Sequence, residues 1–294
     1  MSKTDYTKII SGEPLKTIVR VKPPSNYLRE DIKIMGSNVS LLDANNRCKF
    51  YFYIIFNIFL EVLEEFDARE VYGPEFSLQQ IFDTSLTPYL NPFIQGFSVS
   101  IFGFGSAGTG KTQTIEGNKK EPGLILLFSD SLFNLLENKK YHTNIGKNAQ
   151  NFSYGIRIRY VEIIDEEITD LLAGANNYSD PLQVMFHEWE GPTISNATWI
   201  SVANSTQLNE VFLNGQRSRN NNSNEFGKFS DKATSLFTLE LIQTLELADT
   251  KENLILISKL NFFDLPGYFY FSFSMPNNSF YIKDLIFYWK TLNP

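Results

Sequence analysis

Residues 98–117 read Ser98-Val-Ser-Ile-Phe-Gly-Phe-Gly105-Ser-Ala-Gly-Thr-Gly110-Lys111-Thr112-Gln-Thr-Ile-Glu-Gly117. The apolar opening predicts a buried strand, and the part from Gly105 onward fits the pattern G-x-x-x-x-G-K-T with a predicted helix after it. A strand, a glycine-rich loop and a helix in this order are typical of a P-loop, which holds nucleotide phosphates. A tight strand-to-helix turn is the alternative interpretation. Every specified position of the pattern is filled, and this favours the P-loop.

Each residue type in this loop has a predicted task. Glycines let the backbone wrap closely around phosphate oxygens and present N–H groups to them. Lys111 would reach the outer phosphates, the Thr112 hydroxyl would hold Mg²⁺, and the following helix would point its positive end at the same anion. The predicted nucleotide-binding residues of the loop are Gly105, Ser106, Ala107, Gly108, Thr109, Gly110, Lys111, Thr112 and Gln113.

The composition limits the classes of protein that the chain can belong to. Its 294 residues suit one large α/β domain or two small ones. A single cysteine, Cys48, excludes an intramolecular disulfide, and with His142 and His187 it gives no metal-ligand spacing. The net charge of −7 gives no support for nucleic-acid binding, so we expect no nucleic-acid partner.

The most apolar run, Phe50–Leu63, has 14 residues and is interrupted by Asn57 and Glu61. A membrane-spanning helix needs about 20 apolar residues, so we expect a buried strand or helix here and no membrane association. The first 18 residues are polar and charged, and they contain no apolar core of a signal peptide.

Hydrophobic periodicity predicts alternating strands and helices along the rest of the chain. Strands are expected at Lys16–Lys22, Tyr154–Ile164, Leu182–Phe186, Thr198–Val202, Thr234–Leu247 and Leu254–Leu265. Helices are expected at Ser77–Ile94 with Ser77 as N-cap, at Gly123–Leu136, at Asp165–Leu172, and at Ser205–Asn214 with Gly215 ending it. Ser218–Lys232 is expected to be a loop. The alternation predicts an α/β fold with a central, mostly parallel or mixed sheet and helices on both faces.

The adjacent acids Glu166 and Glu167 would lie in the first turn of one of these short helices. There they would complement the helix dipole and face solvent, and this is favoured over a catalytic carboxylate pair.

Three further motifs accompany the P-loop, whose sequence is similar to "IFAYGQTGSGKTYTMEG". Arg20-Val-Lys22-Pro23 matches R-x-R-P, and Tyr160-Val-Glu-Ile-Ile-Asp-Glu-Glu-Ile-Thr-Asp-Leu-Leu172 resembles "YLEIYNEEIRDLL". Asp264-Leu-Pro-Gly267 resembles the "DLAG" motif called switch II. Four motifs in this order, spread from Lys16 to Gly267, resemble a kinesin motor domain.

The resemblance implies a function as well as a fold. Arg20 and Pro23 would lie against the adenine, Asp264 would lie near Mg²⁺ with Thr112, and the Gly267 N–H would lie near the γ-phosphate. The implied cofactors are ATP or ADP and Mg²⁺, and the implied partner is the microtubule, at the cytoskeleton in the cytoplasm. Residues 16–270 would form the motor domain, with a polar extension at 1–15 and a divergent tail at 271–294.

The chain also departs from the family pattern. The family's switch I reads N-x-x-S-S-R-S-H, whereas an ungapped alignment places Ser230, Asp231 and Lys232 at its S-S-R. Phe269 occupies the position of the switch II glutamate that pairs with the switch arginine. No confident catalytic residue is therefore predicted among Ser230, Asp231, Lys232 and Gly267.

The last residues, 270–294, lack the family's "NKSL" and "SKLT" sequences, so we expect the microtubule-binding helices to be missing. Three hypotheses follow: a motor ATPase, a nucleotide-binding or interaction module that does not hydrolyse ATP, and a fragment of a longer motor. The oligomeric state, the direction of movement and the cargo have no signal in the sequence.

Overall fold

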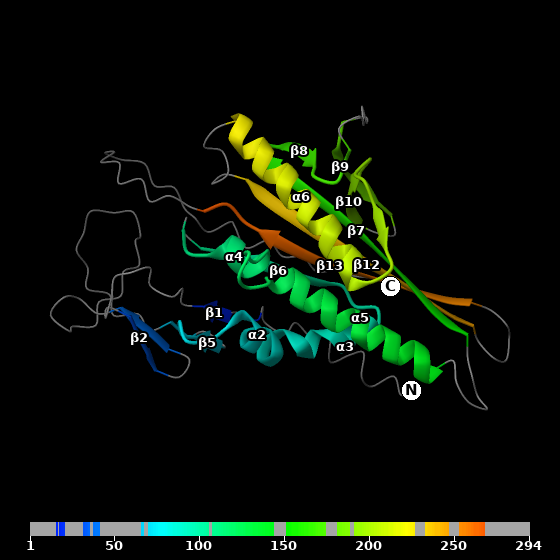
Figure 1. Cartoon of the computed structure of the whole chain (residues 1–294), viewed down its shortest axis with the longest axis horizontal. Helices are drawn as coiled ribbons and strands as arrows, with labels where there is room; N and C mark the ends of the chain where they lie inside the picture. Colours follow the sequence, from blue (N-terminus) through cyan, green and yellow to red (C-terminus); the bar gives the residue numbers. More distant parts are fainter. Residues whose placement is uncertain are drawn as a thin grey trace. The chain divides into compact units, whose positions relative to one another are not determined.

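The computed structural model describes residues 16, 18–20, 32–35, 38–41, 66–67, 70–105, 108–143, 151–174, 181–188, 191–226, 233–246 and 253–267. The chain divides into two units, Met1–Ile81 and Phe82–Pro294, which we describe separately (Figure 1). The predicted extension at 1–15, the apolar run at 50–63 and the tail at 271–294 lie outside the described residues.

Two small sheets and one helical turn make up the first unit. Strand β1 (Ile18–Arg20) pairs in parallel with β5 (Glu70–Tyr72), within the strand predicted at residues 16–22. Strands β2 (Ile32–Met35), β3 (Asn38–Leu41) and β4 (Phe66–Asp67) form an antiparallel sheet.

Helix α2 (Leu78–Ile81) begins with the predicted cap. Ser77 Oγ accepts the Gln80 N–H at 3.2 Å, and Gln80 Oε1 accepts the Ser77 N–H at 2.9 Å. This reciprocal pair satisfies two backbone donors that a helix start leaves without partners.

The second unit begins with the remainder of the helix predicted at residues 77–94, which is irregular. It consists of a π-helix, η1 (Phe82–Leu86), a 3₁₀ turn, η2 (Thr87–Tyr89), and α3 (Leu90–Ile94). Pro88 lies in the 3₁₀ turn and lacks the N–H that a continuous α-helix needs. The hydroxyl of Thr87 donates to the Phe82 carbonyl at 3.2 Å across this irregular turn.

A six-stranded mixed sheet forms the centre of the second unit. Its strands follow the order β11 (Ile200–Val202), β7 (Phe152–Ile164), β12 (Thr234–Glu246), β13 (Asn253–Asp264) and β6 (Val99–Gly103), and β8 (Glu167–Asp170) also pairs with β7. Only β6 and β13 run parallel; the other pairs are antiparallel. The expected α/β architecture with a central mixed sheet is therefore confirmed.

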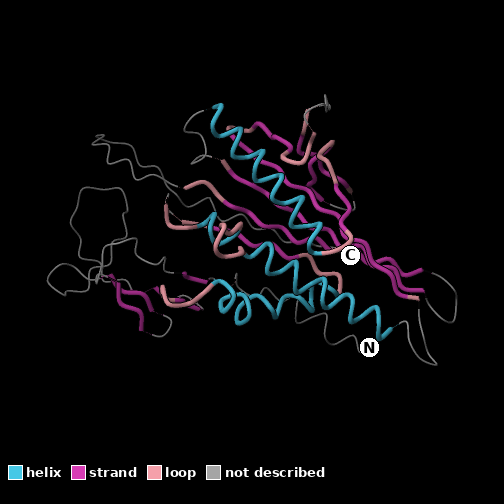
Figure 2. The backbone as a smooth tube through the Cα atoms, viewed as in Figure 1, coloured by secondary structure: helices cyan, strands magenta, loops and turns pink. Residues whose placement is uncertain are grey.

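Helices α4 (Lys111–Ile115), α5 (Leu124–Thr143) and α6 (Ser205–Phe226) lie over one face of this sheet (Figure 1 and Figure 2). Aromatic rings fill the space beneath them. Phe212 of α6 contacts Tyr160 and Phe237, with ring centroids 5.6 and 5.4 Å away. Phe128 of α5 meets Phe262 of β13 edge-on at 6.3 Å. Such edge-to-face contacts add to the stabilisation from burial of the rings.

The helix predicted at Asp165–Leu172 is wrong, because this segment is a hairpin. Strand β8 folds back on β7 with Ile164 opposite Glu167. Asp165 and Glu166 form the two-residue turn with φ values of 46° and 71°. Two left-handed residues give the turn twist that matches the twist of the strands. Glu167 therefore starts a strand, and the dipole role expected for Glu166 and Glu167 does not apply.

Strands β9 (Gln183–His187) and β10 (Gly191–Ser195) form a separate antiparallel hairpin, which lies between β8 and β11 in the sequence. Only its first strand was predicted. Pro192 and Gly191 in the second strand weaken its β-propensity, which hides it from a composition-based prediction.

The prediction that Gly215 ends the helix starting at Ser205 is wrong. The helix continues to Phe226, so the loop predicted at 218–232 is helical over its first nine residues, and 227–232 lie outside the described residues. Gly215 serves close packing instead. A Cβ atom at this position would lie 2.5 Å from Cδ1 of the buried Tyr160 ring.

We expect Gly215→Ala to lower the free energy of unfolding by up to about 2 kcal/mol. Overpacking against the fixed Tyr160 ring costs about 1–3 kcal/mol, and the better helix propensity of alanine returns about 1 kcal/mol. Chemical denaturation measures the difference. Gly155→Ala in β7 is the matched control, because no atom of the residues that the structure describes lies within 4 Å of its Cβ position. A Gly215→Ala protein that is more stable than the wild type would contradict the packing role.

Candidate functional site

The P-loop connects β6 to α4. Gly108 and Gly110 have φ values of 77° and 97°, in the left-handed region that glycine adopts without strain. Gly110 is the N-cap of α4, and Lys111 and Thr112 begin the helix. No atom of the described residues lies within 4 Å of the Cβ position of Gly108. Ser106 and Ala107 lie outside the described residues. Because α4 has only five residues, its dipole would add little to anion binding, which would depend on the loop N–H groups and Lys111.

The two predicted Mg²⁺ residues lie in contact. Thr112 Oγ1 donates a 2.7 Å hydrogen bond to Asp264 Oδ2, across 152 residues of sequence. The parallel pairing of β6 and β13 brings them together, since Asp264 lies opposite Gly103 at the end of the sheet where the P-loop begins. The positions fit a P-loop magnesium site, in which a threonine and a strand-end aspartate hold the ion.

The remaining oxygen of Asp264 supports the same fit. The residue is buried, and Oδ1 accepts no hydrogen bond from any residue that the structure describes. A buried carboxylate oxygen without a donor is costly, and a cation or its bound water would satisfy it. Burial raises the pKa of Asp264, whereas the hydrogen bond from Thr112 and the charge of Arg219 act to lower it.

Arg219 of α6 lies among three carboxylates, which we call the carboxylate cluster: Glu116, Glu162 and Asp264. Its Nη1 lies 2.5 Å from Glu116 Oε1, and its Nε lies 3.0 Å from Glu162 Oε1. Asp264 Oδ2 is farther away, at 3.3 Å from Nη1 and 3.4 Å from Nη2. Burial alone would lower the pKa of Arg219, but Glu116 and the other anionic partners raise it above its ordinary value. The guanidinium is therefore charged.

Among the three carboxylates of the cluster, Glu116 has several further hydrogen-bond partners. Its Oε1 also accepts the hydroxyls of Tyr160 at 2.6 Å and Ser235 at 2.9 Å, and its Oε2 accepts Gln216 Nε2 at 3.2 Å. These donors come from β7, β12 and α6, so one carboxylate joins the end of α4 to three other elements. Burial, and then the charge of Glu116, raise the pKa of Tyr160 well above its ordinary value. Tyr160 therefore stays protonated and donates.

The sequence contains an indication of this cluster, which is that charged residues occupy positions on buried faces. Arg219 shares the helical spacing of Leu208, Phe212 and Gly215, which is the face of α6 that packs on the sheet. Glu162 likewise lies among apolar residues of a buried strand. A charge on an apolar face requires a partner, and the two therefore predict an internal ion pair.

The other predicted site residues lie in different elements or outside the described residues. Arg20 ends β1 in the first unit, and Gln113 lies in α4. Gly267 follows Asp264 by three residues. Pro23 and the switch positions Ser230, Asp231 and Lys232 lie outside the described residues, as does Phe269. The roles expected for these residues stay predictions.

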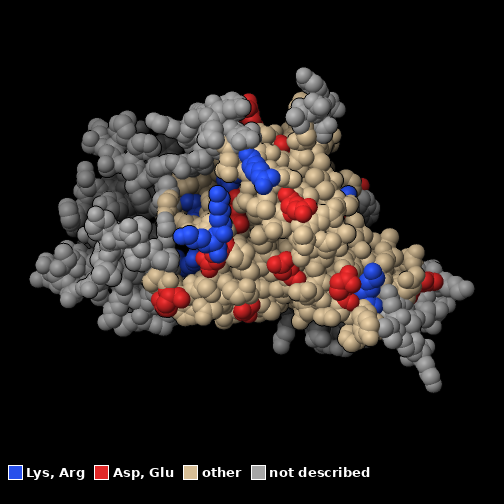
Figure 3. All heavy atoms as spheres, in the orientation of Figure 1, with Lys and Arg blue, Asp and Glu red and all other residues tan. Residues whose placement is uncertain are grey.

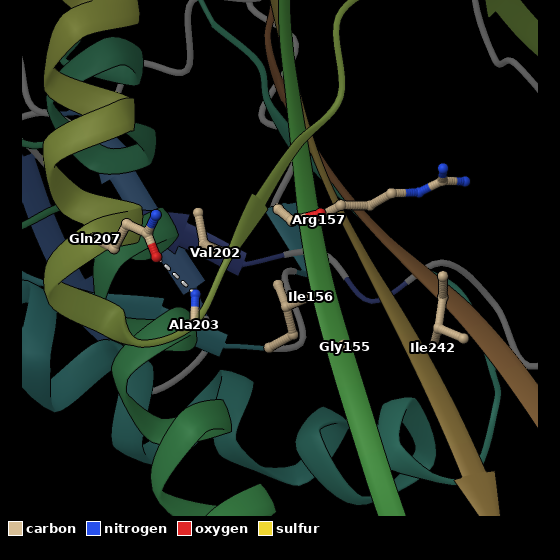
Figure 4. A pocket seen from close by; sticks show the side chains of 8 residues that line it. Gly155, Ile156, Arg157, Val202, Ala203, Gln207 and Ile242 are labelled. Atoms are coloured by element: carbon tan, nitrogen blue, oxygen red, sulfur yellow. Dashed lines mark hydrogen bonds between the residues drawn. The ribbon is translucent and has the colours of Figure 1, made fainter.

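The surface over α4 is the place where basic side chains gather around a hollow, with acidic ones beside them (Figure 3). A separate cavity of about 400 Å³ lies between β7, β11 and the start of α6, lined by residues including Ile156, Val202 and Gln207 (Figure 4). Gln207 Oε1 accepts the Ala203 N–H there at 2.8 Å, which uses its amide oxygen to cap the helix. This cavity is lined by no residue of the P-loop.

The described ranges contain no group of three or more His, Cys, Asp or Glu side chains placed to hold a metal ion by themselves. A magnesium site at Thr112 and Asp264 would therefore depend on phosphate oxygens and water for its other ligands. No helix in the described part of the chain has the length and apolar character needed to cross a membrane.

Known proteins resemble the chain over most of its length. Residues 61–272 match the family model of the kinesin motor domain. Kinesin-like protein KIN-5B of Arabidopsis thaliana is 28% identical over 272 residues, covering 86% of this chain and 24% of that protein. Kinesin-like protein KIN-5C of Oryza sativa subsp. japonica is 28% identical over 222 residues, covering 69% and 21%. The chain thus spans between a fifth and a quarter of the length of these relatives.

A solved structure has the same fold. It is described as "Structure of a fast kinesin: Implications for ATPase mechanism and interactions with microtubules", and it aligns with a TM-score of 0.69 and 21% sequence identity. The alignment covers 86% of this chain and 65% of that one. The family match over residues 61–272, on a fold shared with a solved kinesin, shows that this chain belongs to the kinesin motor domain family.

Proposed function

We propose that this chain binds ATP or ADP together with Mg²⁺ at the P-loop. The observation that carries the proposal is the 2.7 Å hydrogen bond between Thr112 and Asp264, directly behind a loop with two left-handed glycines. A structural turn would need the glycines but has no use for a buried carboxylate with a second, unsatisfied oxygen. Membership of a family of nucleotide-binding motors supports the same proposal.

The residues of the site would bind different parts of the Mg²⁺–nucleotide complex according to their charge. Backbone N–H groups from Gly108 to Lys111 would donate to the phosphate oxygens, and Lys111 would supply a positive charge. Thr112 and Asp264 would hold Mg²⁺, which when bound neutralises phosphate charge. The carboxylate cluster has three carboxylates and one guanidinium, so it carries excess negative charge next to the loop. Such a site disfavours a bare phosphate anion and favours one that arrives with a divalent cation. Arg20 and Pro23 would contact the adenine, as the resemblance implies.

Lys111→Ala is expected to weaken ADP binding on the order of 10–100-fold, because a charged hydrogen-bonding group contributes about 1.5–3 kcal/mol. The measurement is a titration with a fluorescent ADP analogue in excess Mg²⁺. Lys119→Ala is the matched control: this lysine is exposed eight residues farther along and should leave binding unchanged. Equal affinity of the wild type and Lys111→Ala would mean that the loop does not hold phosphate.

A second candidate function is the microtubule-stimulated ATPase of a motor, which the family match favours. Its chemistry would require switch residues that this sequence replaces. Asp231 would place a negative charge beside phosphates that are already anionic, and Lys232 would face Phe269 where the family has a carboxylate. We therefore propose that the chain, with its net charge of −7, holds nucleotide at the cytoskeleton or in the cytoplasm without microtubule-stimulated turnover.

Phosphate release from ATP by this chain is expected to stay near background with or without microtubules. Losing the positioned water and the switch ion pair costs several kcal/mol in the barrier, or on the order of 10³-fold in rate. The assay is steady-state phosphate release at saturating ATP with increasing microtubule concentration. About tenfold stimulation or more, which is some 1.4 kcal/mol off the barrier, would establish the motor function instead.

A further inference from the structure

We propose that Glu116 is a positioning residue that holds Arg219 back from Asp264, and so keeps Asp264 available to the divalent cation that accompanies the nucleotide. The proposal rests on the function proposed above and adds a determinant of Mg²⁺ affinity. The residue lies beyond the pattern G-x-x-x-x-G-K-T, which ends at Thr112, and it is the C-cap of α4.

Unequal distances around the guanidinium are the first observation. Arg219 approaches Glu116 to 2.5 Å and Glu162 to 3.0 Å, as in charge-assisted hydrogen bonds. Both of its contacts to Asp264 go to a single oxygen, at 3.3 and 3.4 Å, which is long for an ion pair. Arginine can also bind one carboxylate with two parallel hydrogen bonds, but Asp264 does not receive that arrangement here. The two glutamates hold the guanidinium short of it.

A guanidinium bound to both oxygens of Asp264 would compete with a cation. It would take Oδ1, the buried oxygen that has no donor among the described residues, and it would weaken the hydrogen bond from Thr112 to Oδ2. It would also place a fixed positive charge where Mg²⁺ needs a negative one. The position of Arg219 therefore determines how strongly the carboxylate of Asp264 attracts the cation.

Glu116 is better placed than Glu162 to fix that position. Tyr160, Ser235 and Gln216 all donate to its carboxylate, so it is held from three elements. Its backbone N–H donates to the Thr112 carbonyl at 2.8 Å, so the carboxylate has a fixed position relative to the P-loop threonine. The Arg219 side chain extends from α6 to the carboxylate of Glu116, so its guanidinium lies at the end of α4.

The test compares the Mg²⁺ dependence of ADP binding in three forms of the whole chain. Glu116→Gln keeps the size and one acceptor oxygen for Tyr160 and Ser235, but it removes the charge that attracts Arg219. A fluorescent ADP analogue at fixed concentration is titrated with Mg²⁺, and the Mg²⁺ concentration at half-maximal binding is recorded. We expect this midpoint to rise about tenfold in Glu116→Gln, equivalent to about 1.4 kcal/mol. Affinity at saturating Mg²⁺ should approach that of the wild type.

Glu240→Gln is the matched control. Glu240 is a buried glutamate of β12, and its ion-pair partners are Arg157, with Nε at 2.5 Å, and Lys259, with Nζ at 3.9 Å. Its loss removes a comparable ion pair without touching the cluster, so the Mg²⁺ midpoint should equal that of the wild type. Equal shifts in both variants would indicate a general loss of stability and would overturn the proposal.

Thermal melting shows whether Glu116→Gln is folded. If it is not, Glu162→Gln replaces it, because that change releases the Nε side of Arg219 and should also raise the midpoint. A folded variant that binds ADP with an unchanged Mg²⁺ midpoint overturns the positioning role of Glu116 while leaving nucleotide binding in place. A wild-type chain that binds no ADP at any Mg²⁺ concentration overturns the proposed function, and this inference with it.

Discussion

A charged guanidinium lies inside this protein, and the arrangement of the second unit around it follows from the need to compensate that charge. Only about a tenth of the Arg219 side chain is exposed, and the carboxylates around it are buried further. An uncompensated buried charge would cost several kcal/mol, so the carboxylates and the arginine require one another. They come from the end of α4, from β7, from β13 and from α6, and the ion pairs therefore fix these elements relative to one another.

The same charged residues connect the P-loop to the central sheet and to α6. Asp264 contacts both Thr112 of the loop and Arg219 of the cluster. Glu116 contacts Arg219 through its side chain and Thr112 through its backbone. The loop and α6 are therefore connected by two short series of contacts, one through Asp264 and one through Glu116. Helix α6 in turn leads to residues 227–232, where the motif resemblance predicts switch I.

Much of the fold could be predicted from local sequence, and the failures have physical causes. The P-loop, the strands at 152–164, 234–246 and 253–264, and the Ser77 cap have strong local patterns. The turn at Asp165 and Glu166 was missed because acidic residues before an apolar pair are equally typical of a helix start. Gly215 was misread because its reason, the Tyr160 ring, is distant in sequence. Motif resemblance named Thr112 and Asp264 together as Mg²⁺ residues, and the structure places them in contact, while their role in holding the ion stays a prediction. The ion pairs of Arg219 depend on tertiary packing, which none of the motifs indicates.

The order of synthesis gives the Thr112–Asp264 contact one more consequence. The two residues are 152 positions apart, and β13 pairs with β6 only through its last five residues. A chain that is still being translated therefore carries its phosphate loop long before the aspartate exists. Local helices and hairpins form within microseconds, but closing this contact must wait for the ribosome, which adds about 5–20 residues per second. For several seconds the nascent chain has a loop of the right sequence without the carboxylate that would complete it.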